Sequence, residues 1–312
     1  MRFISAEEIS AVVSWDGVLN ALYAAHQDAR PLGDNVFVGD TDYGLFTRSV
    51  VLPGLGAGVK VSSIYPANSM AVPAQPTEQA VFLVIDEQTK AIAAILDGPT
   101  ITRWKTAADS ALAAQRLSRD DSRVLLALGS GPIAQALVEA YLHIRPSIDT
   151  ILLWNRTTSR LTETHELLQR RGIKARIVTD LDAAVTEADI ITSATSSTSP
   201  LIRGALIQPG THIDLVGGFR PDMREADDDA ARNSRIFVGD HASAVQSGDL
   251  HGPLKTGIIS AEQIELDLYG LCQQPSIQRA DEDITLYKNA GGAHLDLIVA
   301  QHVLSQLKSV AA

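Results

Sequence analysis

A glycine-rich loop carries the clearest chemical signal in the 312-residue sequence. The segment LGSGPIAQA places Gly129, Gly131 and Ala134 in a G-x-G-x-x-A arrangement, between an apolar run typical of a strand and a segment with helical periodicity. The glycines permit a tight turn and close approach of a pyrophosphate, and the free amides and helix dipole attract the anion. The alternative is a strand-to-helix turn without a ligand. We expect a dinucleotide site with contacts from Gly129, Ser130, Gly131, Pro132 and Ile133.

The residues that follow the next strand of this unit bear on which dinucleotide is bound. An NAD-binding unit usually carries an Asp or Glu there, which binds the ribose hydroxyls. This chain has the segment WNRTTSR, whose cations and polar groups suit a 2′-phosphate. The alternative is that Arg156 and Arg160 are solvated surface charges. The pattern favours NADP(H), with NAD(H) as second choice, and contacts from Asn155, Arg156, Thr157 and Arg160.

Other residue types indicate little further chemistry. Cys272 is the single cysteine, so an internal disulfide and a thiolate zinc site are excluded, and its apolar neighbours favour a buried, inert thiol. The eight histidines, including His241, His251 and His294, form no spaced metal motif. The acidic run EADDDAAR, which begins at Glu225, is typical of a solvated helix face. We expect no metal.

Charge and length exclude several classes of partner. The chain has 26 Lys plus Arg against 37 Asp plus Glu, and this net charge of -11 repels phosphate backbones and anionic lipids. No apolar run approaches the roughly 20 residues that a membrane-spanning helix needs, and the N-terminus lacks a secretion signal. We therefore expect no nucleic acid or membrane partner and a cytoplasmic location.

The secondary structure expected to position these residues changes along the chain. A capping box at Ser5–Glu8 starts a first helix, and β-rich segments between Val36 and Leu96 are typical of a mostly antiparallel sheet. A long helix is expected over Thr102–Leu117. Beyond it, short apolar strands alternate with helices, which indicates a parallel sheet buried on both faces.

These patterns predict an α/β fold: a Rossmann-type doubly wound parallel sheet with a β-rich substrate and dimerisation domain. We place the β-rich domain at residues 1–117 and the dinucleotide-binding domain at 118–292. A last helix begins at Ala293, and we expect residues 293–312 to pack back on the first domain.

Several separated segments, in the same order, resemble the ornithine cyclodeaminase/mu-crystallin family. They are GVKVSSIYPAN, VFLVIDEQTKAIAAILDGPTITRWKTAADSALAA, the GSG loop, ITSATSSTSPLI, VGGFRPDMRE and DITLYKNAGGAHLDLIVA. The resemblance implies a homodimer, and it adds Thr195 to the cofactor contacts. It also implies a small amino-acid or imino-acid substrate. Family members include ornithine cyclodeaminase, an alanine dehydrogenase, reducers of cyclic imino acids, and mu-crystallin, which binds NADPH.

The resemblance implies roles for four residues of the first domain. Lys60 matches the family's active-site lysine, and a lysine that loses solvation in a closed cleft can donate a proton to a substrate nitrogen. Thr77 matches a threonine that lines the site. Lys105 stands where the family has a carboxylate-binding arginine, so the charge stays while the bidentate fork is lost. A second family arginine corresponds to Arg30 or Arg48, and the sequence leaves both open.

The largest departure from the family is Phe219 in VGGFRPDMRE. Ornithine cyclodeaminases carry an aspartate there that acts as a base, and a phenyl ring cannot replace it. Phe219 follows a strand of the parallel sheet, so we expect it at the substrate rather than in the core. We therefore expect an NAD(P)-dependent oxidoreductase that reduces a cyclic or linear α-imino acid (ketimine) with NADPH. The alternatives are ornithine cyclodeamination with NAD, and an NADPH-binding protein without catalysis.

Overall fold

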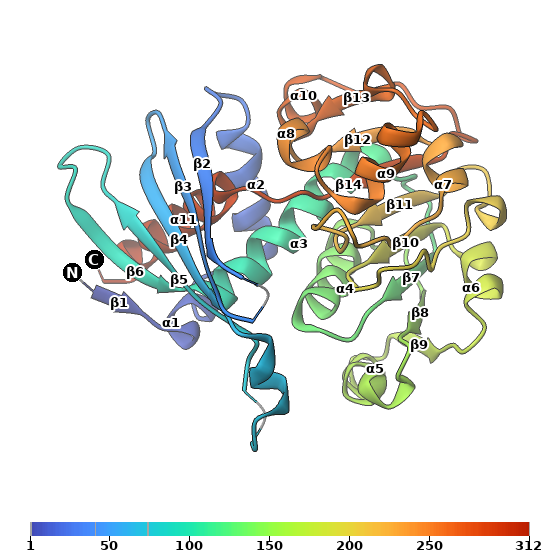
Figure 1. Ribbon diagram of the computed structural model, residues 1–312, viewed down its shortest axis with the longest axis horizontal. Helices are drawn as coiled ribbons and strands as arrows, with labels where there is room; N and C mark the ends of the chain where they lie inside the picture. The colour runs from blue at the N-terminus through green and yellow to red at the C-terminus, as the bar shows by residue number, and fades with distance from the viewer. Residues whose placement is uncertain (1, 41, 74, 312) are drawn as a thin grey trace. The chain divides into compact units, whose positions relative to one another are not determined.

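The computed structural model describes residues 2–40, 42–73 and 75–311 (Figure 1). The contacts divide the chain into two compact units. The β-rich unit comprises the chain up to Lys105 and from Gly292 onward, and the Rossmann unit comprises Thr106–Gly291. The division falls inside helix α3 (Gly98–Leu117), which starts in one unit and ends in the other. The sequence placed the boundary after this helix instead, because a charged break follows it.

The β-rich unit is built on one six-stranded sheet. The strand order is β1-β6-β5-β4-β3-β2, with β1 and β6 parallel and all other neighbours antiparallel. The strands are β1 (Arg2–Ile4), β2 (Leu32–Gly39), β3 (Gly44–Leu52), β4 (Gly56–Ile64), β5 (Glu78–Ile85) and β6 (Ile92–Asp97). The helices are α1 (Ala6–Ser10), α2 (Trp15–Ala25), the 3₁₀ turn η1 (Pro66–Met70) and α11 (Ala293–Ala311).

Helix α11 covers one face of this sheet. It packs against α2 and against β3, β4 and β5. The sheet face beneath it holds alternate residues of each strand, as the two-residue period of a strand requires, among them Gly58, Lys60 and Ser62 of β4. The capping box forms as predicted, since Ser5 accepts from the backbone of Glu8 and the Glu8 carboxylate accepts from the backbone of Ser5.

The Rossmann unit is built on an eight-stranded parallel sheet, which confirms the predicted fold class. Its order is β13-β12-β14-β11-β10-β7-β8-β9, so the chain reverses direction across the sheet between β7 and β10. The strands are β7 (Val124–Leu128), β8 (Thr150–Trp154), β9 (Lys174–Ile177), β10 (Ile190–Ser193), β11 (His212–Leu215), β12 (Arg235–Val238), β13 (Ile264–Asp267) and β14 (Thr285–Lys288).

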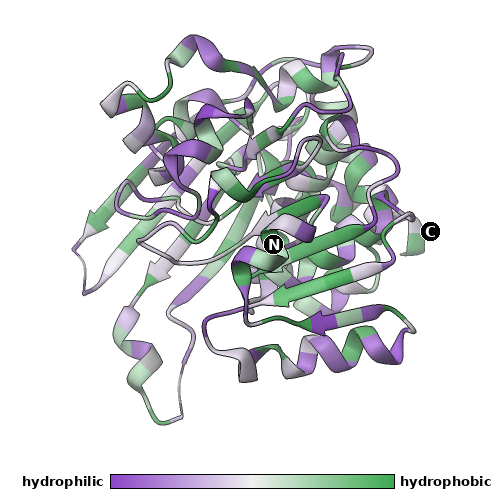
Figure 2. Cartoon of the chain, turned by 90° about the vertical axis from the view of Figure 1, so that its right-hand side faces the viewer, coloured by the Kyte–Doolittle hydropathy of each residue, from purple (hydrophilic) through white to green (hydrophobic). Residues whose placement is uncertain are grey.

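Helices and short turns connect these strands and supply the rest of the core. They are α4 (Pro132–Ile144), η2 (Thr158–Leu161), α5 (Thr162–Arg170), α6 (Leu181–Glu187), η3 (Gly204–Leu206), α7 (Asp228–Arg232), α8 (His241–Ala244), α9 (Gly248–Thr256), η4 (Ala261–Gln263) and α10 (Leu268–Gln273). Figure 2 shows many strands coloured as hydrophobic along most of their length, while helices carry both hydrophobic and hydrophilic stretches. The strands are apolar because both faces of a parallel sheet are covered.

Candidate functional site

The glycine-rich loop has the geometry of a dinucleotide-binding turn. Gly129 has a φ of +115°, and a Cβ there would lie 2.6 Å from the Ala194 carbonyl oxygen, so only glycine fits. Its amide donates to the Trp154 carbonyl at 2.9 Å. A Cβ on Gly131 would meet no atom within 4 Å, and helix α4 begins directly afterwards at Pro132. The loop therefore joins the strands tightly at one glycine and leaves open space at the other, where an anion can reach the helix N-terminus.

This turn lies where ligands of open α/β sheets bind. The strand order reverses between β7 and β10, and the crevice at such a switch point lies outside the carboxyl ends of the strands. The loop from Gly129 leaves the carboxyl end of β7, and Thr195 leaves the carboxyl end of the neighbouring β10. The structure thus brings the predicted loop and Thr195 to the same edge of the sheet.

The predicted 2′-phosphate group lies at the end of the next strand. Asn155 follows β8 directly and donates to the Thr157 carbonyl at 2.9 Å, which fixes the turn. Arg156, Thr157 and Arg160 are exposed, so their cations and hydroxyl are open to a ligand. These side chains occupy the position that the dinucleotide fingerprint gives to ribose recognition.

A buried ionic network, here called the Glu225 cluster, holds the neighbouring strand ends; it consists of Ser193, Thr195, Glu225, Asp249 and Lys288. The Ser193 hydroxyl, the Thr195 hydroxyl and the Thr195 amide donate to Glu225 Oε1, at 2.5, 2.8 and 2.7 Å. The Glu225 and Ala226 amides donate to Asp249 Oδ1. Lys288 Nζ lies 3.1 Å from Asp249 Oδ2 and donates to the Gly217 carbonyl. The cluster ties together the ends of β10, β11 and β14.

The Gly217–Gly218 turn is required by this cluster. A Cβ on Gly217 would lie 2.2 Å from the Thr195 carbonyl oxygen and 2.5 Å from the Glu225 carboxyl carbon. A Cβ on Gly218, whose φ is +59°, would lie 2.2 Å from Asp249 Oδ2. A side chain is therefore excluded at both positions, because the buried carboxylates of Glu225 and Asp249 lie directly against the backbone there.

The Glu225 cluster corrects the sequence prediction for the acidic run. Glu225 was expected on a solvated helix face, but it is fully buried and lies before α7. Burial, with the nearby Asp249 charge, raises the pKa of Glu225 to about 7. Sequence reasoning missed it because the exposed acids of α7 follow it directly. The signal lay in its separation from those acids by Ala226, which is also buried.

Phe219 lies in the loop that follows β11 and is 68% exposed, so it is not a core residue. The Arg220 guanidinium carbon lies 5.8 Å from the centre of its ring, and Arg220 is held by Asp222 at 2.9 Å. A large aromatic side chain that the fold leaves in solvent is available for contact with a ligand.

In the β-rich unit, Lys60, Lys105 and Asp296 form a second ionic group, here called the two-lysine cluster. Lys60 Nζ lies 3.5 Å from Asp296 Oδ1, and Lys105 Nζ lies 4.0 Å from Asp296 Oδ2. Lys60 also donates to Thr102 Oγ1 at 2.5 Å, and Thr102 donates to the Gly98 carbonyl. All three charged residues are buried, with residue exposures of 6%, 4% and 0%. The structure thus brings together both lysines that the sequence singled out.

The structure separates the two arginine candidates. Arg48 of β3 is the register partner of Lys60 of β4, so the two side chains leave the same face of the sheet as neighbours. The Arg48 side chain donates to Asn35 at 3.2 Å. Arg30 is exposed in the segment between α2 and β2. Thr77 is also exposed and precedes β5, and its carbonyl accepts from the Tyr65 amide. Arg48 is therefore the candidate that lies beside Lys60.

Asp296 is a residue that sequence reasoning missed. It lies in the first turn of α11, between Leu295 and Leu297, which are both buried. A single carboxylate among apolar neighbours on a helix that covers a sheet was the available signal, since such a position requires compensating charge.

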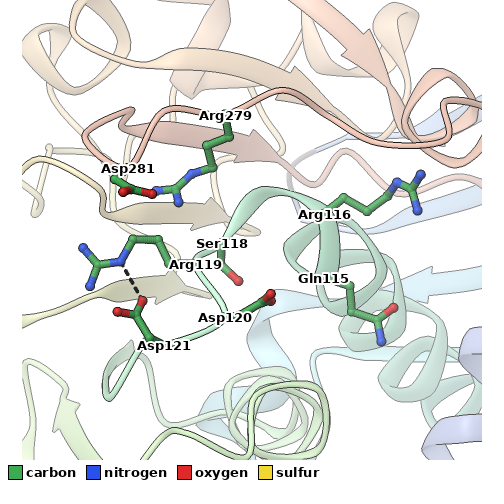
Figure 3. Close-up of a pocket in the computed structure, with 8 residues that line it drawn as sticks. All are labelled: Gln115, Arg116, Ser118, Arg119, Asp120, Asp121, Arg279 and Asp281. Carbon is green, nitrogen blue, oxygen red and sulfur yellow. Dashed lines mark hydrogen bonds and ion pairs between the residues drawn. The ribbon is translucent and has the colours of Figure 1, made fainter.

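The Rossmann unit also has a cavity of about 590 Å³ that is separate from the candidate dinucleotide site (Figure 3). Its lining residues precede β7 and β14, so it lies at the amino ends of these strands, away from the dinucleotide turn. Its cations already have partners: Arg119 contacts Asp121 and Asp189, and Arg279 donates to the Gly210 carbonyl. It is lined by Gln115, Arg116, Ser118, Arg119, Asp120, Asp121, Arg279 and Asp281.

Other candidates for chemistry are few. Cys272 is buried, and burial raises the pKa of its thiol to about 12, so it is an inert thiol at neutral pH. Within residues 2–40, 42–73 and 75–311, no group of three or more His, Cys, Asp or Glu side chains has an arrangement that could hold a metal ion. No helix in this described part of the chain is long and apolar enough to span a membrane.

A parallel sheet with a G-x-G-x-x-A turn at its switch point, joined to a β-rich unit with two buried lysines, defines a two-unit Rossmann protein. Residues 52–310 match the model of the ornithine cyclodeaminase/mu-crystallin family. The chain belongs to this family.

Three relatives show the range of the family. A Delta(1)-pyrroline-2-carboxylate reductase of Paracoccus denitrificans is 39% identical over 306 residues, which cover 97% of this chain and 96% of that protein. The structure of Thermococcus litoralis Delta(1)-pyrroline-2-carboxylate reductase, in complex with NADH and L-proline, is similar with a TM-score of 0.93, 25% identity and coverage of 100% and 99%. A probable ornithine cyclodeaminase from Bordetella pertussis has a TM-score of 0.88, 29% identity and coverage of 99% and 97%.

Proposed function

We propose that this protein is an NAD(P)-dependent oxidoreductase that reduces a small cyclic or linear α-imino acid, with Delta(1)-pyrroline-2-carboxylate as the first candidate substrate. The observation that carries the proposal is the two-lysine cluster, which presents two buried cations in a chain that also has a dinucleotide-binding turn. The named reductases among its relatives, one of them in complex with NADH and L-proline, support the same reaction.

The residues suit the requirements of imine reduction. The bound nicotinamide would supply a hydride to the carbon of the C=N bond, and a proton must reach the nitrogen. Lys60, which contacts Thr102 and Asp296, would orient or protonate that nitrogen. Lys105 and Arg48 are the cations that would hold the substrate carboxylate. Thr77 and Phe219 are further proposed substrate contacts.

The test is a substrate screen that follows nicotinamide absorbance, with NADPH and NADH each offered to cyclic imino acids and to pyruvate plus an amine. We expect oxidation of the reduced cofactor with a cyclic imino acid that carries an α-carboxylate. The matched compound without the carboxylate should be a poor substrate, because the cations then have no anion to hold. Absence of turnover across the panel, with tight NADPH binding, would leave the protein as a binder without catalysis.

We propose NADP(H) as the preferred cofactor and NAD(H) as the second. The support is the Asn155 side chain at the end of β8, where an acid would repel a 2′-phosphate, and the exposed Arg156, Thr157 and Arg160 beside it. The dinucleotide would also contact Thr195 and the loop Gly129–Ile133. Arg156→Ala should weaken NADPH binding about tenfold and leave NADH binding within about twofold, as isothermal titration would show. Arg170→Ala, at an exposed arginine of α5, is the matched control.

We also propose that the β-rich unit forms a homodimer. The face of the sheet opposite α11 carries several exposed apolar side chains, and β2 is an edge strand whose residues are all exposed. Such a face is typical of a protein interface. Its exposed large apolar side chains are Leu32, Val36, Val38, Leu45 and Val51. Light scattering should give a dimer mass for the wild type and a monomer mass for Val36→Lys/Val38→Lys. A wild-type monomer at micromolar concentration would contradict the proposal.

Cyclodeamination of ornithine is not favoured. Phe219 stands where that reaction needs a carboxylate base. Two experiments separate the reactions: ammonia release from ornithine with NAD by the wild type, and the same assay on Phe219→Asp. Release by the wild type would restore the cyclodeaminase assignment.

A further inference from the structure

The buried carboxylate of Asp296 has an unusual environment. Its residue exposure is 0%, and among the described residues neither of its oxygens accepts a hydrogen bond. Two ammonium groups lie close to it, Lys60 Nζ at 3.5 Å from Oδ1 and Lys105 Nζ at 4.0 Å from Oδ2. Each oxygen therefore faces a different lysine.

The helix does not account for this residue. Acidic side chains in a first turn stabilise a helix when they accept from its free amides, but the Leu295 amide donates to the Gly292 carbonyl, and Asp296 accepts from none of the described amides. Its neighbours Leu297 and Ile298 are buried apolar residues. An ionised carboxylate in such surroundings costs several kcal/mol unless opposite charge compensates it. The two lysines are that compensation.

The three charged groups come from three separate elements of the β-rich unit. Lys60 is on β4, Lys105 on α3 and Asp296 on α11, and Thr102 of α3 fixes Lys60 from the side at 2.5 Å. The lysine side chains retain 8% and 5% exposure while the Asp296 side chain retains none, so the lysines keep some contact with solvent and the carboxylate does not. One carboxylate between two ammonium groups leaves one positive charge, to which Arg48 beside Lys60 adds another.

We propose that Asp296 is a positioning residue for the reduction: it holds the Lys60 and Lys105 ammonium groups at a fixed separation and offsets their mutual repulsion. This inference rests on the proposed function, because the two lysines act on an imino acid only if the protein reduces one. Without the carboxylate the two like charges repel each other, and their alignment toward the carboxylate and nitrogen of the substrate is lost.

The experiment is a double-mutant cycle with Asp296→Asn, Lys105→Met and the double variant, scored by the KM of the imino acid in steady-state kinetics. Asp296→Asn should raise this KM about tenfold in the wild-type background and less than about twofold in the Lys105→Met background. The dissociation constant of NADPH should stay unchanged in all variants. Equal factors in both backgrounds, or a KM that Asp296→Asn leaves unaltered, would overturn the inference.

Two controls separate this role from a structural one. Asp214→Asn changes another fully buried aspartate, in the Rossmann unit, which accepts from Ser110 and Thr192 and contacts neither lysine of the cluster. It should lower the melting temperature without raising the imino-acid KM, and a KM rise equal to that of Asp296→Asn would overturn the inference. If Asp296→Asn does not fold, Lys105→Met and the double variant carry the test, with equal KM expected for both and a further rise in the double variant overturning it.

The wild type in the same assay separates the two proposals. If it oxidises no reduced cofactor with any imino acid, the proposed function fails and the role of Asp296 fails with it. If it turns over and the cycle is additive, the inference about Asp296 alone fails.

Discussion

Two buried ionic clusters in this protein stabilise buried carboxylates in different ways. In the Glu225 cluster, three donors converge on Glu225 Oε1, two amides bind Asp249 Oδ1, and Lys288 pairs with Asp249 Oδ2 at 3.1 Å. In the two-lysine cluster, Asp296 accepts no hydrogen bond from the described residues, and its lysines lie at 3.5 and 4.0 Å. Hydrogen bonds hold one oxygen of Glu225 and one of Asp249 in the first network. In the second network the carboxylate of Asp296 has only ion pairs with the described residues, while Lys60 is also hydrogen-bonded to Thr102.

The difference indicates different tasks. Backbone amides and a carbonyl take part in the Glu225 cluster, so it fixes the course of the chain at the ends of β10, β11 and β14. In the two-lysine cluster the contacts of the Asp296 carboxylate are with side-chain ammonium groups at 3.5 and 4.0 Å, and among the described residues no backbone amide donates to it. We therefore expect mutations in the Glu225 cluster to act mainly on stability, and mutations in the two-lysine cluster mainly on catalysis.

Lys60→Met should produce the largest effect on activity. Removal of the proposed proton donor should lower kcat for imine reduction by about 10²–10⁴-fold, because general acid catalysis supplies a factor of that size. The free energy of unfolding should be affected much less than kcat, because Lys105 still lies close to Asp296 and compensates its charge. Steady-state kinetics and urea unfolding provide the two readouts. Lys174→Met, at an exposed lysine on β9, is the control, and comparable kcat values for both variants would refute the assignment.

Lys288→Met should have the opposite profile. It leaves Asp249 buried at 1% side-chain exposure without its cation, which should lower the free energy of unfolding by about 3–5 kcal/mol. Urea denaturation measures this loss. Lys255→Met, at an exposed lysine of α9, should change it by no more than about 0.5 kcal/mol. If Lys288→Met and Lys255→Met unfold at the same urea concentration, the Glu225 cluster does not have the structural role that distinguishes it from the two-lysine cluster.

Glu225→Gln sharpens the comparison through pH. The pKa of Glu225 is about 7 in the folded protein, against an ordinary 4.5, because of burial and the Asp249 charge. Between these values the folded state binds more protons than the unfolded state, so wild-type stability falls as pH rises through the window. The glutamine variant lacks this loss and keeps an acceptor for Ser193 and Thr195.

The stability difference between wild type and Glu225→Gln should therefore shift in favour of the variant by roughly 3 kcal/mol from pH 4.5 to above pH 7. Urea unfolding at a series of pH values measures it. Burial also raises the pKa of Asp214 to about 6, but this residue is present in both proteins and cancels in the difference. A difference that is flat across the range would show that Glu225 does not titrate there.

The sequence predicted the Rossmann unit well because its signals are local. Apolar strands, helical periodicity and the spacing of Gly129 and Gly131 all act over short stretches of chain, and the structure has the corresponding parallel sheet and turn. The two clusters could not be predicted in the same way. Glu225 meets Ser193, and Lys60 meets Asp296, only through strand and helix packing between distant segments. Arg48 was separable from Arg30 only through the β3–β4 register.

Lys105→Arg should produce the smallest effect. It tests whether the cation at this position binds the substrate. An arginine stands at this position in the family that the sequence resembles, and its planar fork can hold a carboxylate through two parallel hydrogen bonds. If the cation at this position binds the substrate carboxylate, the KM of the imino acid should fall about threefold to fivefold. The larger side chain at a site with 4% exposure should also lower the free energy of unfolding by about 1–3 kcal/mol.

Steady-state kinetics with the imino acid varied at saturating NADPH measures the change, and Lys105→Met is the control that removes the charge. A rise in KM as large as that of Lys105→Met would mean that this position depends on its packing with Asp296 and not on a cation offered to the substrate. Lys105 would then have a mainly structural role, as the members of the Glu225 cluster do, and Lys60 alone would remain as the catalytic member of the two-lysine cluster.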